Sequence, residues 1–167
     1  MNVLSCMSTY LPMIHIGSSY GAKYLLLRTE NAANEYPIEE VWWINGAEYA
    51  DSAGADIINS SLGYNEFDDV SLSYKANDLN GKTALISRAA SILDSKGIIL
   101  CNSAGNSGSD NWKFIGVPAD ASDILSVAAV DFRGNRASFS SFGRKENKYA
   151  PNIAVMGKDV AVVSGNN

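Results

Sequence analysis

The sequence predicts an α/β fold in which a three-layer, mostly parallel sheet carries helices on both faces. Short apolar runs alternate along the chain with segments whose apolar residues recur at helical spacing, and this alternation is typical of parallel sheets. The chain has 167 residues, of which 46% are hydrophobic. That is enough for one sizeable core and too little for two ordinary domains. We therefore expect one domain over residues 1–167.

The first strand and the first core helix are expected between residues 22 and 53. Ala22 to Arg28 form an apolar run after a glycine, which suits a strand buried on both faces. Pro37 suits a first helical turn, and two glutamates follow it near the positive end of a helix. Apolar residues then recur at near-helical spacing until Gly54. The pattern predicts a helix over about 37–53.

The remaining elements follow the same logic. Residues 64–81 are polar without a sustained period, so a long surface loop is expected there. Helical spacing returns over 82–95, and Gly97 is the expected stop. Further strands are expected over 56–60, 98–102 and 124–130, with shorter ones over 138–142 and 160–163.

Two of the predicted strands end in small, polar loops that contain glycine. They are Ser60-Ser61-Leu62-Gly63 and Ser103-Ala104-Gly105-Asn106-Ser107-Gly108. In a parallel sheet, ligands bind outside the carboxyl ends of the strands. The two loops should therefore lie side by side at one rim.

Composition excludes several classes of function. The formal net charge is -5 and the basic residues are scattered, which argues against nucleic acid as a partner. No apolar run approaches the roughly 18 residues of a membrane helix. A nucleotide-binding, flavodoxin-like module would need a glycine-rich phosphate loop after a strand, and none is present. No cofactor is expected. Cys6 and Cys101 are too few for a disulfide framework and are expected to be free thiols.

Three blocks of the sequence resemble the subtilisin (subtilase) family, in the same order. They are residues 56–63, which read Asp-Ile-Ile-Asn-Ser-Ser-Leu-Gly, residues 97–106, which end in Asn-Ser-Ala-Gly-Asn, and the stretch from Pro118 to Gly143. The resemblance implies a subtilisin-like fold, of which this chain is the central part, incomplete at both ends. It also implies a helix at residues 1–7 and a cis bond between Val117 and Pro118.

The resemblance also implies the parts of a substrate groove. Ser61, Leu62 and Gly63 resemble the backbone segment that pairs with an extended peptide, a form of strand addition. Ser103, Ala104 and Gly105 resemble the opposite wall of the same pocket. The expected partner is an extended peptide or protein substrate.

Asn106 resembles the oxyanion asparagine of this family. Its carboxamide is a neutral donor that could stabilise charge on a scissile carbonyl oxygen. Taken without the neighbouring blocks, an asparagine between glycine-bearing turns more simply caps its own backbone. Ser107 is interpreted as a loop hydroxyl, because no nucleophile-elbow pattern surrounds it.

The catalytic triad of the family is not found in the sequence. The Asp-x-Gly, His-Gly-Thr and Gly-Thr-Ser blocks are all absent. His15, between two isoleucines, is expected to be a surface or partly packed side chain. The family function is that of a serine-type endopeptidase, and this chain alone is expected to be inactive. The alternative is a non-catalytic protein that binds peptides in the same groove.

Two further expectations concern metal ions and location. The segment from Tyr10 to Gly17 lacks the oxygen-bearing side chains with which many subtilisins hold calcium, and a hard cation needs about 6–8 oxygens. No metal site is expected. The parent protein is expected to be secreted or bound to the cell envelope by resemblance, although this chain carries no signal peptide.

Overall fold

The computed structural model describes residues 2–143 and 151–163. They form two compact units, each with its own internal contacts. The smaller unit comprises residues 1–26 and 159–167, and the larger comprises residues 27–158. The candidate site lies wholly in the larger unit.

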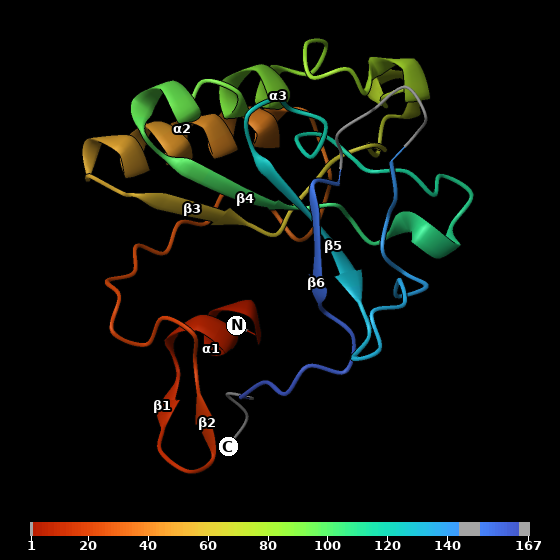
Figure 1. The fold of residues 1–167 in the computed structure, drawn as a ribbon. Coiled ribbons are helices and arrows are strands. Elements are labelled where there is room, and N and C mark those ends of the chain that lie inside the picture. Colours follow the sequence, from red (N-terminus) through yellow and green to blue (C-terminus); the bar gives the residue numbers. More distant parts are fainter. Residues whose placement is uncertain (1, 144–150, 164–167) are drawn as a thin grey trace. The chain divides into compact units, whose positions relative to one another are not determined.

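The larger unit is built on a four-stranded parallel sheet with the strand order β3-β4-β5-β6 (Figure 1). The strands are β3 (Ile57–Ser60), β4 (Ile99–Ser103), β5 (Leu125–Val130) and β6 (Ile153–Met156). All three pairings are parallel. This confirms the predicted α/β class with a parallel sheet, and the three strands expected at 56–60, 98–102 and 124–130 are present.

Helices α2 (Ile38–Ser52) and α3 (Leu85–Ala90) pack together on one face of this sheet (Figure 1). Their apolar sides meet alternate strand residues in one core cluster, in which Ile86 and Leu100 are 0% and 1% exposed. Trp43 of α2 donates a hydrogen bond from Nε1 to Ser60 Oγ at 3.1 Å. This bond ties the helix to the carboxyl end of β3, where the candidate site begins.

The opposite face of the sheet carries exposed apolar side chains. These are Ile57, Ile99, Leu125, Ile153 and Val155. They lie on one face because side chains alternate along each strand and the parallel registers keep matching positions in step. A second helical layer over this face, which the sequence led us to expect, stays a prediction.

The smaller unit contains helix α1 (Asn2–Ser8) and a short hairpin of β1 (Tyr10–Leu11) and β2 (His15–Ile16). Backbone N–H groups of Gly17, Ser18 and Ser19 bond carbonyl oxygens at the end of α1 and just after it. These bonds satisfy groups that a helix end leaves unpaired. A Cβ on Gly17 would lie 2.3 Å from the carbonyl oxygen of Met7, so the close approach requires glycine. The helix implied for residues 1–7 is therefore confirmed.

The strand predicted over Ala22–Arg28 is wrong. Residues 23–31 run without helix or strand, and Leu25, Leu26 and Leu27 are each more than 40% exposed. A buried parallel strand needs a neighbour to satisfy its backbone groups, and no described strand pairs with this segment.

The bounds predicted for α2 agree with the structure, and the length predicted for α3 was too great. Helix α2 covers 38–52 against an expected 37–53. Helix α3 starts only at Leu85, because the Asn80 side chain accepts hydrogen bonds from the backbone of residues 82 and 83 and holds them in a turn. After Ala90 the helical segment continues as tight turns up to Gly97. The φ of Gly97 is 79°, in the left-handed region that is expected at a helix stop.

Three further expectations need correction. The loop at 64–81 is not purely a surface feature, since it contains two short 3₁₀ turns and buries Tyr64, Phe67 and Leu79 in the core. The short strands expected over 138–142 and 160–163 do not form. In the first of these, the hydroxyl of Ser140 accepts the N–H of Ala129, which replaces strand pairing. Strand β6 was not anticipated.

Candidate functional site

The two predicted loops lie next to each other at the carboxyl ends of β3 and β4. The register aligns Ser60 with Asn102, the last pair between β3 and β4. Asn102 is 1% exposed, and its Nδ2 donates to the carbonyl oxygens of Leu62 at 3.3 Å and Ser103 at 2.8 Å. One buried amide therefore joins the two loops, as their expected side-by-side arrangement requires.

The segment from Ser61 to Gly63 is not paired with another stretch of backbone. With the described part of the chain it forms no backbone–backbone hydrogen bond, although the Leu62 carbonyl oxygen accepts from the Asn102 side chain. Ser61 and Gly63 are exposed, and β3 is an edge strand of the sheet. An extended backbone with unpaired N–H and C=O groups at a sheet edge can accept another strand.

The far end of this segment is held rigidly. Tyr64 forms reciprocal backbone bonds with Val117, at 2.8 Å and 2.9 Å. A Cβ on Gly116 would lie 2.9 Å from the Tyr64 carbonyl oxygen, so the two chains approach closely. Val117 and Pro118 are joined by a cis peptide bond, as the resemblance implied. The segment is thus held at its middle residue by Asn102 and just beyond its end by Val117.

Ser103 to Gly105, predicted as the opposite wall, are held by backbone hydrogen bonds. The N–H of Ala104 bonds Val127 at 2.9 Å, and the carbonyl oxygen of Gly105 accepts the N–H of Ser141 at 3.0 Å. Gly105 has a φ of 105°, and a Cβ there would lie 2.9 Å from Ser141 Oγ. Only glycine fits this combination without strain. The residue that fixes the wall, Ser141, is 1% exposed and was not foreseen as part of the site.

Asn106 follows this wall with an exposed side chain. It occupies the N-cap position of a short 3₁₀ turn (Ser107–Ser109), but its side chain forms no capping hydrogen bond. Instead, the N–H of Ser107 is bonded by Ser141 Oγ at 3.0 Å. The turn-capping interpretation of Asn106 therefore finds no support among the described contacts, and its carboxamide is available to a ligand.

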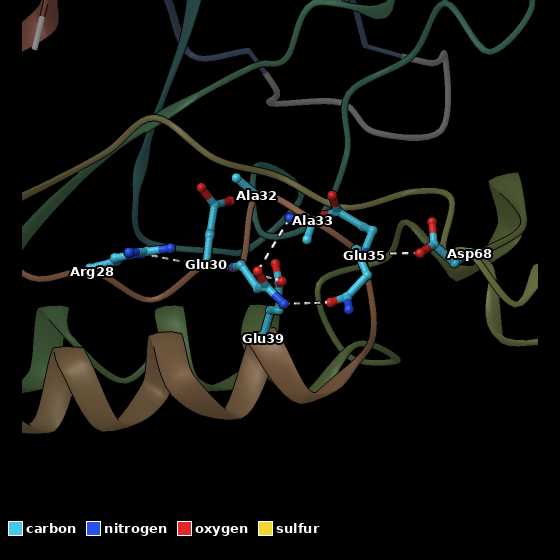
Figure 2. Close-up of a pocket in the computed structure, with 9 residues that line it drawn as sticks. Arg28, Glu30, Ala32, Ala33, Glu35, Glu39 and Asp68 are labelled. Carbon is cyan, nitrogen blue, oxygen red and sulfur yellow. Dashed lines mark hydrogen bonds between the residues drawn. The ribbon is translucent and has the colours of Figure 1, made fainter.

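An acidic pocket lies in the same unit and was not anticipated from the sequence. Its lining includes Glu30, Glu35, Glu39 and Asp68, with Arg28 at one side (Figure 2). Burial and the nearby charge of Glu39 raise the pKa of Glu30 and of Glu35. The sequence indicated only that Glu39 lies near the start of a helix. The structure shows that its side chain is buried, with 1% exposed.

Several other expectations concern single residues. Cys6 and Cys101 are free and half-buried. His15 is half-buried on β2, as expected for a partly packed side chain. Within residues 2–143 and 151–163, no three His, Cys, Asp or Glu side chains are grouped so that they could hold a metal ion. No described helix is long and apolar enough to cross a membrane.

Comparison with known proteins identifies the family of the chain. The model of the subtilase family, peptidase S8, matches residues 5–167. The chain belongs to the subtilase family. Among relatives, subtilisin DY of Bacillus licheniformis is 37% identical over 113 residues, which cover 67% of this chain and 36% of that protein. Subtilisin E of Bacillus subtilis (strain 168) is 35% identical over 118 residues, 68% of this chain and 26% of that protein. The match thus spans about a quarter to a third of the length of these relatives.

Solved structures of subtilases share the fold. The self-cleaved protease domain of PatA superimposes with a TM-score of 0.75 at 23% identity, over 98% of this chain and 55% of that chain. The epidermin leader peptide processing serine protease of Staphylococcus aureus gives 0.63 at 21% identity, over 94% and 39%. At these identities the likeness concerns the subtilase fold alone.

Proposed function

We propose that this chain supplies the substrate groove and the oxyanion donor of a serine-type endopeptidase domain. One arrangement supports this proposal. The backbone edge at Ser61–Gly63 follows β3 and Asn106 follows β4, and Asn102 joins the two loops. The Asn106 carboxamide forms no hydrogen bond within the described part of the chain. Ser103, Ala104 and Gly105 form the opposite wall. Family membership supports the same reaction class.

The chemistry follows from these two features. An extended peptide would pair with the edge through main-chain hydrogen bonds. This would hold its scissile carbonyl near Asn106, whose amide donates to the oxyanion as a serine attacks. A side-chain amide serves this step because it needs no change of protonation during turnover. In the complete domain, the serine, the histidine that takes its proton and the aspartate that orients the histidine would come from the family blocks that this sequence lacks.

The chain by itself is proposed to bind peptides without cleaving them. The Asp-x-Gly, His-Gly-Thr and Gly-Thr-Ser blocks are absent from the 167 residues, so no activated nucleophile is expected. The alternative function, a non-catalytic peptide-binding protein, rests on the same free edge. A further proposal, by resemblance, is that the parent protein is secreted or located in the cell envelope.

Two measurements on the purified chain test these proposals. A fluorophosphonate probe should label no serine, and covalent labelling of any serine would overturn the proposed inactivity. Hydrogen exchange should then report on the groove. An extended peptide should slow exchange at the free N–H groups of residues 61–63, while unchanged exchange there at saturating peptide would exclude strand addition.

An experiment that adds the three triad blocks distinguishes the endopeptidase function from the non-catalytic alternative. A domain that joins this chain to family segments carrying the three triad residues should cleave peptides, and Asn106→Ala should then lower the rate. If such a domain folds and binds peptide but does not cleave it, the non-catalytic alternative is favoured.

A further inference from the structure

A second hollow in the larger unit, the aromatic pocket, is lined mainly by apolar rings. Its volume is about 420 Å³, and its lining includes Glu66, Phe67, Val70, Tyr74, Lys75 and Trp112. Residues 66–75 belong to the loop after β3, and Trp112 belongs to the loop after β4. The described lining contains no residue of Ser61–Gly63 or Ser103–Gly105. The aromatic pocket is therefore distinct from the pocket that the family resemblance implies.

The walls of the aromatic pocket continue the two sides of the proposed groove. Glu66 follows Gly63 by three residues, so their Cα atoms are at most about 11 Å apart. The two loops are joined just before the pocket begins, through the reciprocal backbone bonds of Tyr64 and Val117. A bound strand rises about 3.3 Å per residue. The pocket therefore lies within about three residues of the part of a peptide that pairs with the edge.

Hydrogen bonds and packing hold the aromatic side chains of the pocket in place. Trp112 donates from Nε1 to the carbonyl oxygen of Ile115 at 3.1 Å, which fixes the plane of the indole. The hydroxyl of Tyr74 donates to the buried carboxylate of Glu40. Phe67 is 4% exposed and packs against Tyr74, with ring centroids 5.9 Å apart. A ligand therefore does not need to order these rings when it binds.

The lining favours an apolar ligand. The rings of Phe67, Tyr74 and Trp112 offer the faces and edges against which another aromatic ring packs. Val70 adds an apolar side chain that is 80% exposed to solvent, and exposed apolar surface beside a pocket is typical of interaction sites. Glu66 and Lys75 are exposed and carry opposite charges. The described lining therefore does not select a charge of one sign.

We propose that the aromatic pocket binds a large apolar side chain, preferably an aromatic one, of a peptide held on the Ser61–Gly63 edge. The inference rests on the proposed function, which supplies the peptide. A phenylalanine side chain fits within the volume of about 420 Å³ and would shield Val70 from water while it packs beside Trp112. The loop after β3 would thus select one apolar residue a few positions away from the paired stretch.

The pocket is tested first with a small probe that does not need the groove. N-acetylphenylalanine methylamide, titrated into the 15N-labelled chain, should give a saturable shift of the Trp112 indole N–H signal. The indole signals of Trp42 and Trp43, which do not line the pocket, should not move. N-acetylalanine methylamide has the same backbone and should bind about tenfold or more weakly. Equal binding of the two probes, or no saturable shift at Trp112, would overturn the proposal.

Matched variants on one 3₁₀ turn separate the pocket from folding. Val70 and Leu72 are exposed apolar residues of the same turn, and of the two only Val70 lines the pocket. Val70→Asp should weaken the phenylalanine probe about tenfold, because it places a charge against an apolar ligand. Leu72→Asp should leave the affinity unchanged. If Val70→Asp does not fold, Val70→Asn takes its place, and equal affinities in the folded variants would refute the assignment.

Extended peptides then link the pocket to the groove. A series that carries one phenylalanine at successive positions of an alanine–serine peptide should show one preferred position, and Val70→Asp should abolish that preference. Protection of the N–H groups at residues 61–63 without any positional preference would refute the pocket and leave the proposed function standing. Probe binding at Trp112 without protection at residues 61–63 would instead refute the peptide groove, and with it the assignment of the occupant.

A second copy of the chain is the competing occupant of the aromatic pocket. Sedimentation over a range of concentrations measures this directly. A monomeric chain whose Trp112 signal responds to the phenylalanine probe supports the proposal. Self-association that Val70→Asp abolishes and Leu72→Asp preserves would mean that another copy fills the pocket, and would overturn the proposal.

Discussion

The side-chain amide of Asn102 lies 3.3 Å from the carbonyl oxygen of Leu62 and 2.8 Å from that of Ser103, and so joins the two loops of the candidate site. Asn102→Ala removes both hydrogen bonds at a position that is 1% exposed. We expect a loss of about 1–3 kcal/mol in the free energy of unfolding, measured by urea denaturation. Peptide binding at the neighbouring edge should weaken as well.

Asn106→Ala is the matched control for that experiment. Its side chain is exposed and caps nothing, so the change in unfolding free energy should stay within about 0.5 kcal/mol. If Asn106→Ala destabilises the chain as much as Asn102→Ala, its carboxamide has a structural role that the described contacts do not reveal.

Asn106→Ala should lower the catalytic rate although it leaves the free energy of unfolding nearly unchanged. In a complete domain that carries the triad, Asn106→Ala should lower kcat by about 10²–10³ with little change in KM, a magnitude that comes from subtilisin itself. Steady-state kinetics on a peptide substrate measure it. A reduction below tenfold would remove Asn106 from the oxyanion site.

Gly105 tests how tightly the opposite wall is packed. An alanine there would combine a φ of 105° with a Cβ only 2.9 Å from Ser141 Oγ, which bonds the N–H of Ser107. Gly105→Ala should cost about 1–3 kcal/mol. Gly134→Ala is the control, because its φ of 81° is also left-handed but nothing lies within 4 Å of the added Cβ. It should cost about 1 kcal/mol, and equal losses would mean that the Ser141 contact is unimportant.

Glu40 should stabilise the packing of α2 against α3. The Glu40 carboxylate accepts the Tyr74 hydroxyl at 2.5 Å and the N–H of Ile86 at 2.9 Å, at the start of α3. Glu40→Ala leaves both donors without a partner and should cost about 1–3 kcal/mol in thermal or urea unfolding. Unchanged stability of this variant would mean that the two hydrogen bonds contribute little to folding.

Glu30 and Glu35 should make the stability of the folded chain depend on pH. Burial and the nearby charge of Glu39 raise the pKa values of both carboxyls. A carboxylate with a raised pKa binds protons more readily in the folded state, so Glu30 and Glu35 oppose folding at neutral pH and cease to do so as the pH falls past their raised pKa values. Urea denaturation at several pH values measures this contribution, and an unchanged pH dependence in Glu30→Gln and Glu35→Gln would contradict the prediction.

Local sequence patterns predicted those helices and strands whose signals lie within their own residues. The helix at 38–52 has its own period and its own start signal, and the strands at 57–60, 99–103 and 125–130 are short apolar runs bounded by glycine or polar residues. The apolar run at 22–28 has the same pattern but does not form a strand. A strand also needs a neighbouring strand to pair with, and the sequence of the run itself does not specify one.

Residues of the candidate site could be predicted only where they belong to a sequence motif of the family. The loops at 61–63 and 103–106 could be named because their residue types and spacing resemble a family. Asn102 and Ser141 could not. The buried amide of Asn102 bonds Leu62, 40 positions away, and Ser141 bonds residues 107 and 105, which are 34 and 36 positions away, so both acquire their roles only after folding. The carboxylates of the pocket come from three stretches, and no sequence window contains them all.

If the edge at Ser61–Gly63 binds a peptide as proposed, it does so through the main chain, and it should then be largely indifferent to the order of side chains along most of the bound stretch. Its limits are set by backbone chemistry instead. A proline or an N-methylated residue removes an N–H group that the edge would otherwise engage, and such residues should mark, position by position, where the bound strand begins and ends.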